Sequence, residues 1–354
     1  MGLLGVSFYG LPTPSVDETL SSWLFRCSFN PYTANFTRLV LAERPSQWWE
    51  GLELKSADPD TDFLSASRRM GAGREHINPD LLSNYFSLCN DTLVEWSRRR
   101  FFCPDCLRDD VASGHLPMWR KSWCYVHSCI CSVHDQELIA LSDASHYSKA
   151  WDAFVQVCNS VSGSITAKDS RLPRFRSTTL MKVEHSLACS RVTQQNILVD
   201  LFNRLLSIFL QSPFRGSRGG AARIHFQSER GMRFADPPSF EQSISKGPST
   251  ADPSSRFGSV VFAASLLGIL PHSRFLMFTK ACEDAKTGML IPKDLHRAAA
   301  FPYVDRAGYR VLHRYLGNFP RKDFPLLDRH LQLQEARYAR EGVLSGHPFG
   351  VTLD

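Results

Sequence analysis

The residues with the clearest chemical meaning are cysteines and histidines gathered between positions 103 and 134. Cys103 and Cys106 form a Cys-x-x-Cys pair, and one turn of chain at this spacing directs two thiolates toward one metal ion. A tetrahedral zinc ion needs two more ligands. Two Cys-x-x-His pairs downstream have the right residue types to supply them.

These two pairs overlap in sequence and compete for the same role. Cys124 with His127 follows Cys106 closely, and Cys131 with His134 lies seven residues further on. Both spacings are geometrically reasonable, but the two pairs together exceed the four ligands of one tetrahedral ion. Spacing alone therefore leaves the choice open.

The residues around the second pair resemble a knuckle between two strands. Segment 123–130 mixes Trp, Tyr, Val and Ile, as strands do, and the run ELIAL at 137–141 is a second strand candidate. Asp135, between them, is a turn former. This layout favours Cys131 and His134 as ligands and makes Cys124 and His127 ordinary strand residues.

A site closed by four protein ligands is expected to be structural, because catalytic zinc keeps one position for water. The chain also lacks a Gly-x-x-x-x-Gly-Lys-Ser/Thr phosphate loop and a Gly-x-Ser-x-Gly nucleophile elbow. The sequence therefore predicts a structural Zn²⁺ and no enzymatic activity.

The rest of the chain predicts a mainly α protein, with helix-turn-helix elements and a small zinc-ribbon-like β insert. Five regions are expected: a helical, helix-turn-helix-like region over 1–100, the zinc module over 101–142, a helical region over 143–211, a linker or long loop over 212–256 and a helical domain over 257–354.

Helical periodicity and end signals predict the individual helices. Ser15 and Glu18 form a capping-box pattern that predicts a helix starting near Val16. A helix over 61–70, a stop at Gly71 and helical sequence after it fit a helix-turn-helix unit. Helices are expected over 33–44, 61–70, 78–97 (one helix or two), 150–161, 193–211, 257–270, 274–285, 293–300 and 305–317.

The charge balance is mildly basic, with a net charge of +6. This balance is compatible with nucleic acid or acidic protein partners. The candidate contacts for phosphates or a partner are Arg68, Arg69, Arg74, Arg98, Arg99 and Arg100.

Two motifs give the chain a resemblance to the TniQ family, which includes the TnsD-type target selectors of bacterial transposons. The first motif lies near the N-terminus and comprises Pro14, Glu18, Ser21, Ser22, Trp23, Leu24 and Arg26. The second comprises Cys103, Pro104, Cys106, Leu107, Asp109, Arg120, Trp123, Cys131 and His134. Its gap of seven residues after Trp123 also selects Cys131 and His134, and the motifs together cover roughly residues 10–140.

The resemblance implies an adaptor that connects a target-recognition element to the AAA+ regulator that recruits the transposase. The chain is similar to short members that dock on an RNA-guided Cascade complex, often as a homodimer. Longer TnsD-type members read a DNA attachment site directly, which is the alternative. Arg26 and Arg120 are expected to brace the zinc module by ion pairs or by cation–π contact with Trp123. Trp23 is expected in the core.

The N-terminal sequence MGLLGVSFYG has no signal-peptide pattern, and no run of 18 apolar residues occurs. The most apolar stretch, 257–270, is predicted to be a buried helix. We therefore expect a cytoplasmic protein that does not enter a membrane, and the resemblance implies that this cytoplasm is bacterial.

Overall fold

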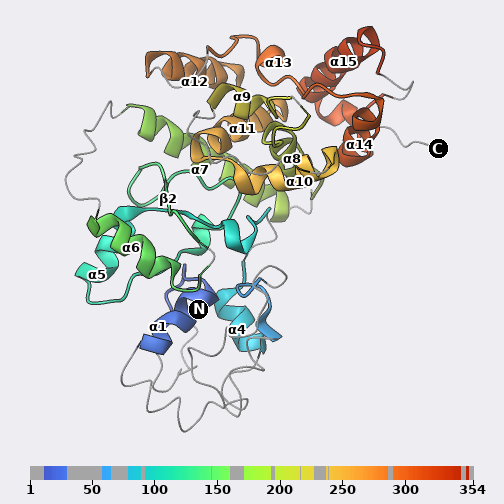
Figure 1. Ribbon diagram of the computed structural model, residues 1–354. Helices are drawn as coiled ribbons and strands as arrows, with labels where there is room; N and C mark the ends of the chain where they lie inside the picture. The colour runs from blue at the N-terminus through green and yellow to red at the C-terminus, as the bar shows by residue number, and fades with distance from the viewer. Residues whose placement is uncertain are drawn as a thin grey trace. The chain divides into compact units, whose positions relative to one another are not determined.

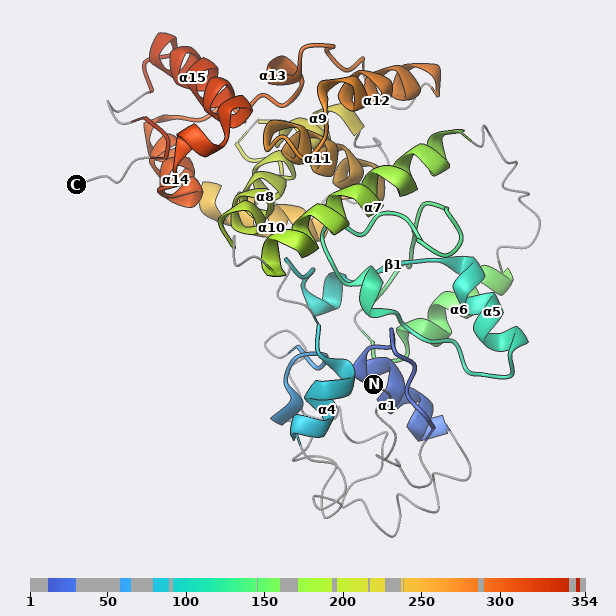
Figure 2. The ribbon, with the colours of Figure 1, turned by 180° about the vertical axis from the view of Figure 1, so that it is seen from behind.

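The structure is a computed structural model, and it is mainly helical, with one two-stranded sheet (Figures 1 and 2). This confirms the predicted fold class. The residues that it describes are 12–29, 58–64, 79–88, 92–144, 146–159, 171–192, 196–215, 217–226, 237, 239–285, 290–343 and 348–350. In this part of the chain, no helix is long and apolar enough to cross a membrane.

The chain divides into two compact units. The first comprises residues 1–125 and 138–165, and the second comprises 126–137 and 166–354. The regular elements of the first unit are α1 (Leu20–Phe29), α4 (Pro79–Phe86), η3 (Trp96–Arg98), β1 (Phe101–Phe102), α5 (Pro104–Ala112), η4 (Lys121–Trp123), β2 (Ile139–Ala140) and α6 (Lys149–Asn159).

Helix α1 begins four residues later than the capping-box pattern predicted. The Glu18 carboxylate does accept a hydrogen bond from the Ser15 N–H, at 3.1 Å, as in a capping box. The helix starts only at Leu20, however, because the Thr19 hydroxyl accepts from the Ser22 N–H at 3.4 Å and acts as the cap. Glu18 is thereby left free to serve a buried network described below.

The short sheet holds the start of the metal module in place. Strands β1 and β2 are antiparallel, with Phe101 opposite Ala140 and Phe102 opposite Ile139. The second expected strand thus exists within the ELIAL run. The strand expected over 123–130 is wrong: this segment starts in the 3-10 turn η4 and makes only single bridges, at Tyr125 and Ile130.

The second unit is built around α11 (Pro253–Leu266), of which thirteen of the fourteen residues are buried. This confirms the prediction of a buried apolar helix. Helices α7, α8, α9, α12, α13 and α15 pack against it, and Figures 1 and 2 show it among them. The other regular elements of this unit are α7 (Arg171–Val192), α8 (Asn196–Phe209), α9 (Ala221–Phe226), α10 (Phe240–Thr250), α12 (His272–Asp284), α13 (Leu295–Ala298), α14 (Arg306–Leu316), η5 (Arg321–Asp323) and α15 (Pro325–Arg340).

Segment 212–256 was expected to be a linker or long loop, and this expectation is wrong. It contains α9, α10 and the first residues of α11. Its glycines permit close packing rather than flexibility: a Cβ on Gly220 would lie 2.3 Å from the Phe209 carbonyl oxygen, and one on Gly247 would lie 2.3 Å from that of Leu210. Both contacts are impossible for any residue with a side chain.

Most other predicted helices match. The regions 150–161, 193–211, 257–270, 274–285, 293–300 and 305–317 correspond to α6, α8, α11, α12, α13 and α14. The helical sequence predicted over 78–97 forms less helix than expected. Helix α4 ends at Phe86, and only the 3-10 turn η3 follows it. The helix over 33–44, and most of the helix-turn-helix unit, lie outside the described residues.

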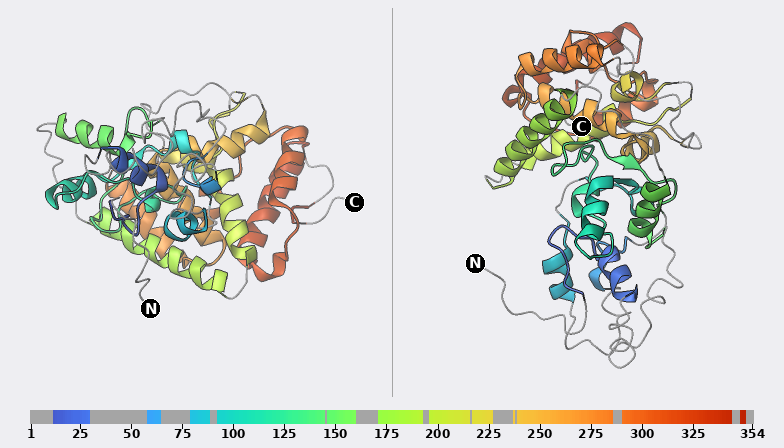
Figure 3. Two further views of the ribbon diagram at one scale, coloured as in Figure 1. Left: turned by 90° about the horizontal axis from the view of Figure 1, so that it is seen from below. Right: turned by 90° about the vertical axis from the view of Figure 1, so that its left-hand side faces the viewer.

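Figure 3 shows the packing inside the first unit, where α5 (teal) and α6 (green) lie side by side. Helix α6 contributes the fully buried Lys149, whose Nζ lies 4.5 Å from the ring centroid of Trp96 and 5.0 Å from that of Trp119. Burial lowers the pKa of Lys149 to about 8. The cation–π contacts offset part of the cost of burying this charge, because Nζ has no hydrogen-bond partner within the described part of the chain.

His330, in α15, is a buried titratable group that should make the second unit sensitive to acid. Its side chain is fully buried, and neither ring nitrogen has a hydrogen-bond partner among the residues that the structure describes. The edge of Phe301 and the parallel ring of His296 enclose it, at 4.9 and 5.6 Å between ring centroids. Burial lowers the pKa of His330 to about 3, with smaller contributions from His296 and Arg337.

We expect this histidine to destabilise the fold progressively as the pH falls below 6.5, the pKa of a free histidine. In this pH range His330 binds a proton in the unfolded chain but stays neutral in the folded chain. The free energy of unfolding should fall by about 1.3 kcal/mol between about pH 7.5 and about pH 5.5 from this group alone. Denaturant unfolding of the wild type and of His330→Leu at both pH values measures it. Other groups titrate equally in both proteins, so an unchanged difference between the two would contradict the prediction.

Candidate metal centre

Four predicted ligands come together in the structure. The ligand atoms of Cys103, Cys106, Cys131 and His134 all lie within 4.8 Å of one another. The three cysteines are buried and the histidine is half-buried. The sequence-predicted set is thus the set that the fold assembles, and it is able to bind a metal ion.

One distance within the cluster has the length that tetrahedral zinc requires. The Sγ of Cys131 lies 3.6 Å from the Nδ1 of His134. Zinc bonds of about 2.3 Å to sulfur and 2.0–2.1 Å to nitrogen, at a tetrahedral angle, separate the two ligand atoms by about 3.5 Å. The donor set of three sulfurs and one nitrogen is typical of structural zinc sites. The residues therefore fit zinc, with Nδ1 as the ligand atom of His134.

The first knuckle lies where β1 passes into α5. Cys103 occupies the N-cap position with extended backbone, Pro104 starts the helix, and Cys106 lies in the first turn. Pro is favoured there because its missing N–H would have no helical partner. The free N–H groups of a helix start favour negative charge, which stabilises the thiolates that bind metal.

The second knuckle is a tight turn closed by backbone pairing. Ile130 bridges Glu137, and the Cys131 N–H donates to the Gln136 carbonyl at 2.8 Å. Asp135 adopts the left-handed conformation, with φ of 50°, which confirms it as the turn former. The turn thereby holds the two ligands of this knuckle on one side.

Glu137 attaches this turn to the helices of the second unit. Its carboxylate pairs with Arg176 of α7 and accepts a hydrogen bond from the Ser254 hydroxyl of α11, at 2.9 Å. Arg176 is itself buried and lies over the Phe257 ring. Sequence spacing gave no signal for this anchor, because the three elements are far apart in the chain.

Cys124 and His127, the competing Cys-x-x-His pair, contact other residues. Cys124 is fully buried, its thiol donates to the Arg120 carbonyl at 3.5 Å, and burial raises its pKa to about 12. Burial also raises the pKa of the Cys129 thiol. His127 lies 4.0 Å from the Glu184 carboxylate.

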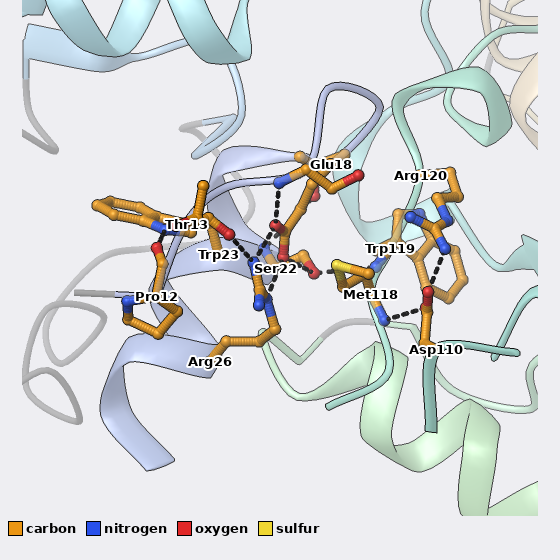
Figure 4. Close-up of polar contacts among 12 residues, drawn as sticks. Pro12, Thr13, Glu18, Ser22, Trp23, Arg26, Asp110, Met118, Trp119 and Arg120 are labelled. Carbon is orange, nitrogen blue, oxygen red and sulfur yellow. Dashed lines mark hydrogen bonds and ion pairs between the residues drawn. The ribbon is translucent and has the colours of Figure 1, made fainter. Parts of the chain in front are cut away.

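The first motif of the resemblance forms a buried network around Glu18 (Figure 4). Its Oε1 accepts from the Ser22 hydroxyl at 3.0 Å and from Arg26 Nε at 2.8 Å. Its Oε2 accepts from the Ser15 N–H and from Arg26 Nη2, at 3.1 and 2.5 Å. Glu18 is fully buried, and all four of its neighbours are donors, so only a carboxylate satisfies the site.

This network continues into the segment between the two knuckles. The Ser22 hydroxyl accepts from the Trp119 N–H at 2.9 Å, and the Thr19 N–H donates to the Trp119 carbonyl at 3.0 Å. The backbones of Glu18 and Arg120 also pair as an isolated antiparallel β-bridge. Two motifs that are nearly a hundred residues apart thus form one hydrogen-bonded unit.

Asp110, and not the neighbouring Asp109 of the motif, is the acidic residue that joins this unit. Its side chain pairs with Arg120 and accepts from the Met118 N–H at 2.9 Å, whereas Asp109 is exposed. Burial raises the pKa of Asp110 despite the neighbouring guanidinium. Because Asp110 lies in α5, this ion pair links Arg120 to the helix that carries Cys106.

The other motif residues are structural as well. Trp23 is fully buried, as expected, and its indole N–H donates to the Pro12 carbonyl at 2.7 Å. Arg26 pairs with Glu18 and also donates to the Thr13 carbonyl at 2.9 Å. Trp123 is buried with its ring edge-on to Trp119, at 5.4 Å between ring centroids.

The predicted nucleic-acid contacts divide into three cases. The prediction for Arg99 is wrong. Arg99 is buried and paired with Asp58 and Asp60, so phosphates cannot reach it. Arg98 and Arg100 are half-buried, and Arg100 lies over the Phe101 ring at 5.2 Å from its centroid. Arg68, Arg69 and Arg74 lie outside the described residues.

Comparison with protein-family models, with curated proteins and with solved structures found no match to any of them. The function of this chain is therefore inferred from its own residues.

Proposed function

We propose that this chain is a zinc-stabilised, non-catalytic adaptor of the TniQ type in bacterial transposition. In this role it links an RNA-guided Cascade complex to the AAA+ regulator that recruits the transposase, and it acts as a cytoplasmic homodimer. The observation that carries the proposal is the single buried unit formed by the two motifs on which the resemblance depends.

The geometry supports a scaffold better than an active centre. Four protein side chains are available for one ion, so a tetrahedral metal would have no position for a water nucleophile. The buried polar groups around Glu18 are saturated by one another. Both features hold the surrounding segments in one conformation, and a rigid surface of this kind suits the docking of a partner protein.

Co-expression with a guide-RNA complex and the AAA+ regulator of a transposon tests the adaptor role. We expect the tagged chain to retain the guide-RNA complex through purification and to increase the recovery of the regulator with it. The alternative is a TnsD-like protein that reads an attachment site directly. Tight, sequence-selective binding to naked DNA at physiological salt, without the guide-RNA complex, would favour that alternative.

A further inference from the structure

Helix α14 in the second unit carries a row of arginines on its exposed side. Arg306, Arg310 and Arg314 are spaced four residues apart, and residues at this spacing share one face of a helix. All three are exposed, and the only other exposed residue of this helix is Ala307. We define this set of three as the arginine row.

The opposite side of α14 is used entirely for packing. Tyr309, Leu312 and Leu316 are fully buried, and the helix contacts α8 and α10 (Figures 1 and 2). The arginine row is therefore held rigidly, because the helix is fixed along its whole length. Its outward side presents cations and one small residue.

No ion pair joins this row to a carboxylate within the described residues. The exposed Asp305 is the N-cap of α14, the helix itself contains no Asp or Glu, and Arg310 and Arg314 make no hydrogen bond or ion pair with the described part of the chain. Arg306 only donates to the Gly342 carbonyl, at 3.1 Å. Glu241 lines the same cavity as Arg314, of about 390 Å³, but no ion pair joins the two.

Some other arginines of the same unit do have carboxylate partners. Arg321 pairs with Asp328 and Glu335, and Arg204 pairs with Asp200. Like charges four residues apart destabilise a helix. An external anion bound along the row would relieve this repulsion.

We propose that the arginine row binds the phosphate backbone of duplex DNA. Successive arginines are separated by about 6 Å along the helix axis, so each can meet a different phosphate of one strand, and guanidinium binds phosphate in a bidentate manner. Single-stranded sites need stacking aromatics between the cations, and Ala307 provides none. Membrane-surface helices insert their apolar face, and here that face is buried in the unit.

The test is a salt titration of binding to a fluorescent duplex of mixed sequence, measured by anisotropy. Substituting glutamine at all three positions (R306Q, R310Q, R314Q) should weaken binding at low salt by about tenfold or more, and should reduce the slope of log K against log salt by about 2 to 3. The triple lysine variant should retain most of the slope. Circular dichroism and thermal unfolding check that each variant folds.

A matched control removes three exposed lysines of the same unit, with Lys182, Lys280 and Lys293 each changed to glutamine. This control should retain the wild-type slope. An equal loss in the control, an unchanged slope in the glutamine variant, or no duplex binding by the wild type would overturn the proposal. Equal row-dependent binding of single-stranded DNA, a poly-glutamate peptide or phosphatidylserine vesicles would also overturn it. The outcome does not depend on the proposed adaptor function.

Discussion

Replacing Cys131 with serine should release the metal and unfold part of the chain. A serine hydroxyl is a poor zinc ligand, and the binding free energy of a structural metal is folding free energy. We expect the free energy of unfolding to fall by more than about 4 kcal/mol. Losses of this size are exceptional for a single substitution, and the loss of a structural metal is one of their few causes. Denaturant unfolding, together with the metal content of the purified variant, measures both effects.

Cys124→Ser is the matched control, because Cys124 is equally a buried cysteine of a Cys-x-x-His pair. A serine hydroxyl can still donate to the Arg120 carbonyl, so we expect a loss of only about 1 kcal/mol and full metal content. A chelator should destabilise the wild type and this control, and have little further effect on Cys131→Ser. If Cys124→Ser lost the metal and Cys131→Ser kept it, the assignment of the ligands would be wrong.

Glu18→Gln should be the most damaging substitution outside the ligand set. It places an amide NH₂ among four donors and leaves the Arg26 guanidinium buried without a counter-charge. Breaking a buried ion pair on one side costs about 3–5 kcal/mol. Denaturant unfolding measures the loss. Its control is Asp143→Asn, which removes the partner of His146 in an exposed pair and should cost less than about 1 kcal/mol.

The outcome for Glu18→Gln also tests whether the two motifs form one unit. The network passes from Glu18 through the Ser22 hydroxyl to the Trp119 N–H, so disturbing one end should loosen the other. We expect the near-ultraviolet circular dichroism of the buried tryptophans to change in the variant. A loss of stability no larger than that of Asp143→Asn would show that the contacts around Glu18 contribute little.

Sequence patterns predicted the ligands and the amphipathic helices because both depend on local spacing. A Cys-x-x-Cys pair fixes two thiolates within one turn, and the periodicity of α8 or α14 survives in almost any context. The choice of Cys131 over Cys124 was favoured by a turn signal, Asp135, that the structure confirms. Local rules were sufficient at these positions.

The errors occurred where tertiary contacts decide. Gly220 and Gly247 were taken for linker residues, but they allow two chain segments to approach within contact distance. Arg99 was predicted to be a surface cation, but it is buried and forms ion pairs with Asp58 and Asp60, some forty residues earlier in the chain. No short-range pattern distinguishes a glycine that permits packing from one that permits flexibility.

Metal analysis combined with X-ray absorption spectroscopy on the purified, reduced protein would show whether these four side chains hold a closed zinc site. We expect one zinc ion per chain, with three sulfur ligands at about 2.3 Å, one nitrogen at about 2.0–2.1 Å and no oxygen. Protein without bound metal, or an ion that carries a water molecule in place of one of the four side chains, would contradict this expectation.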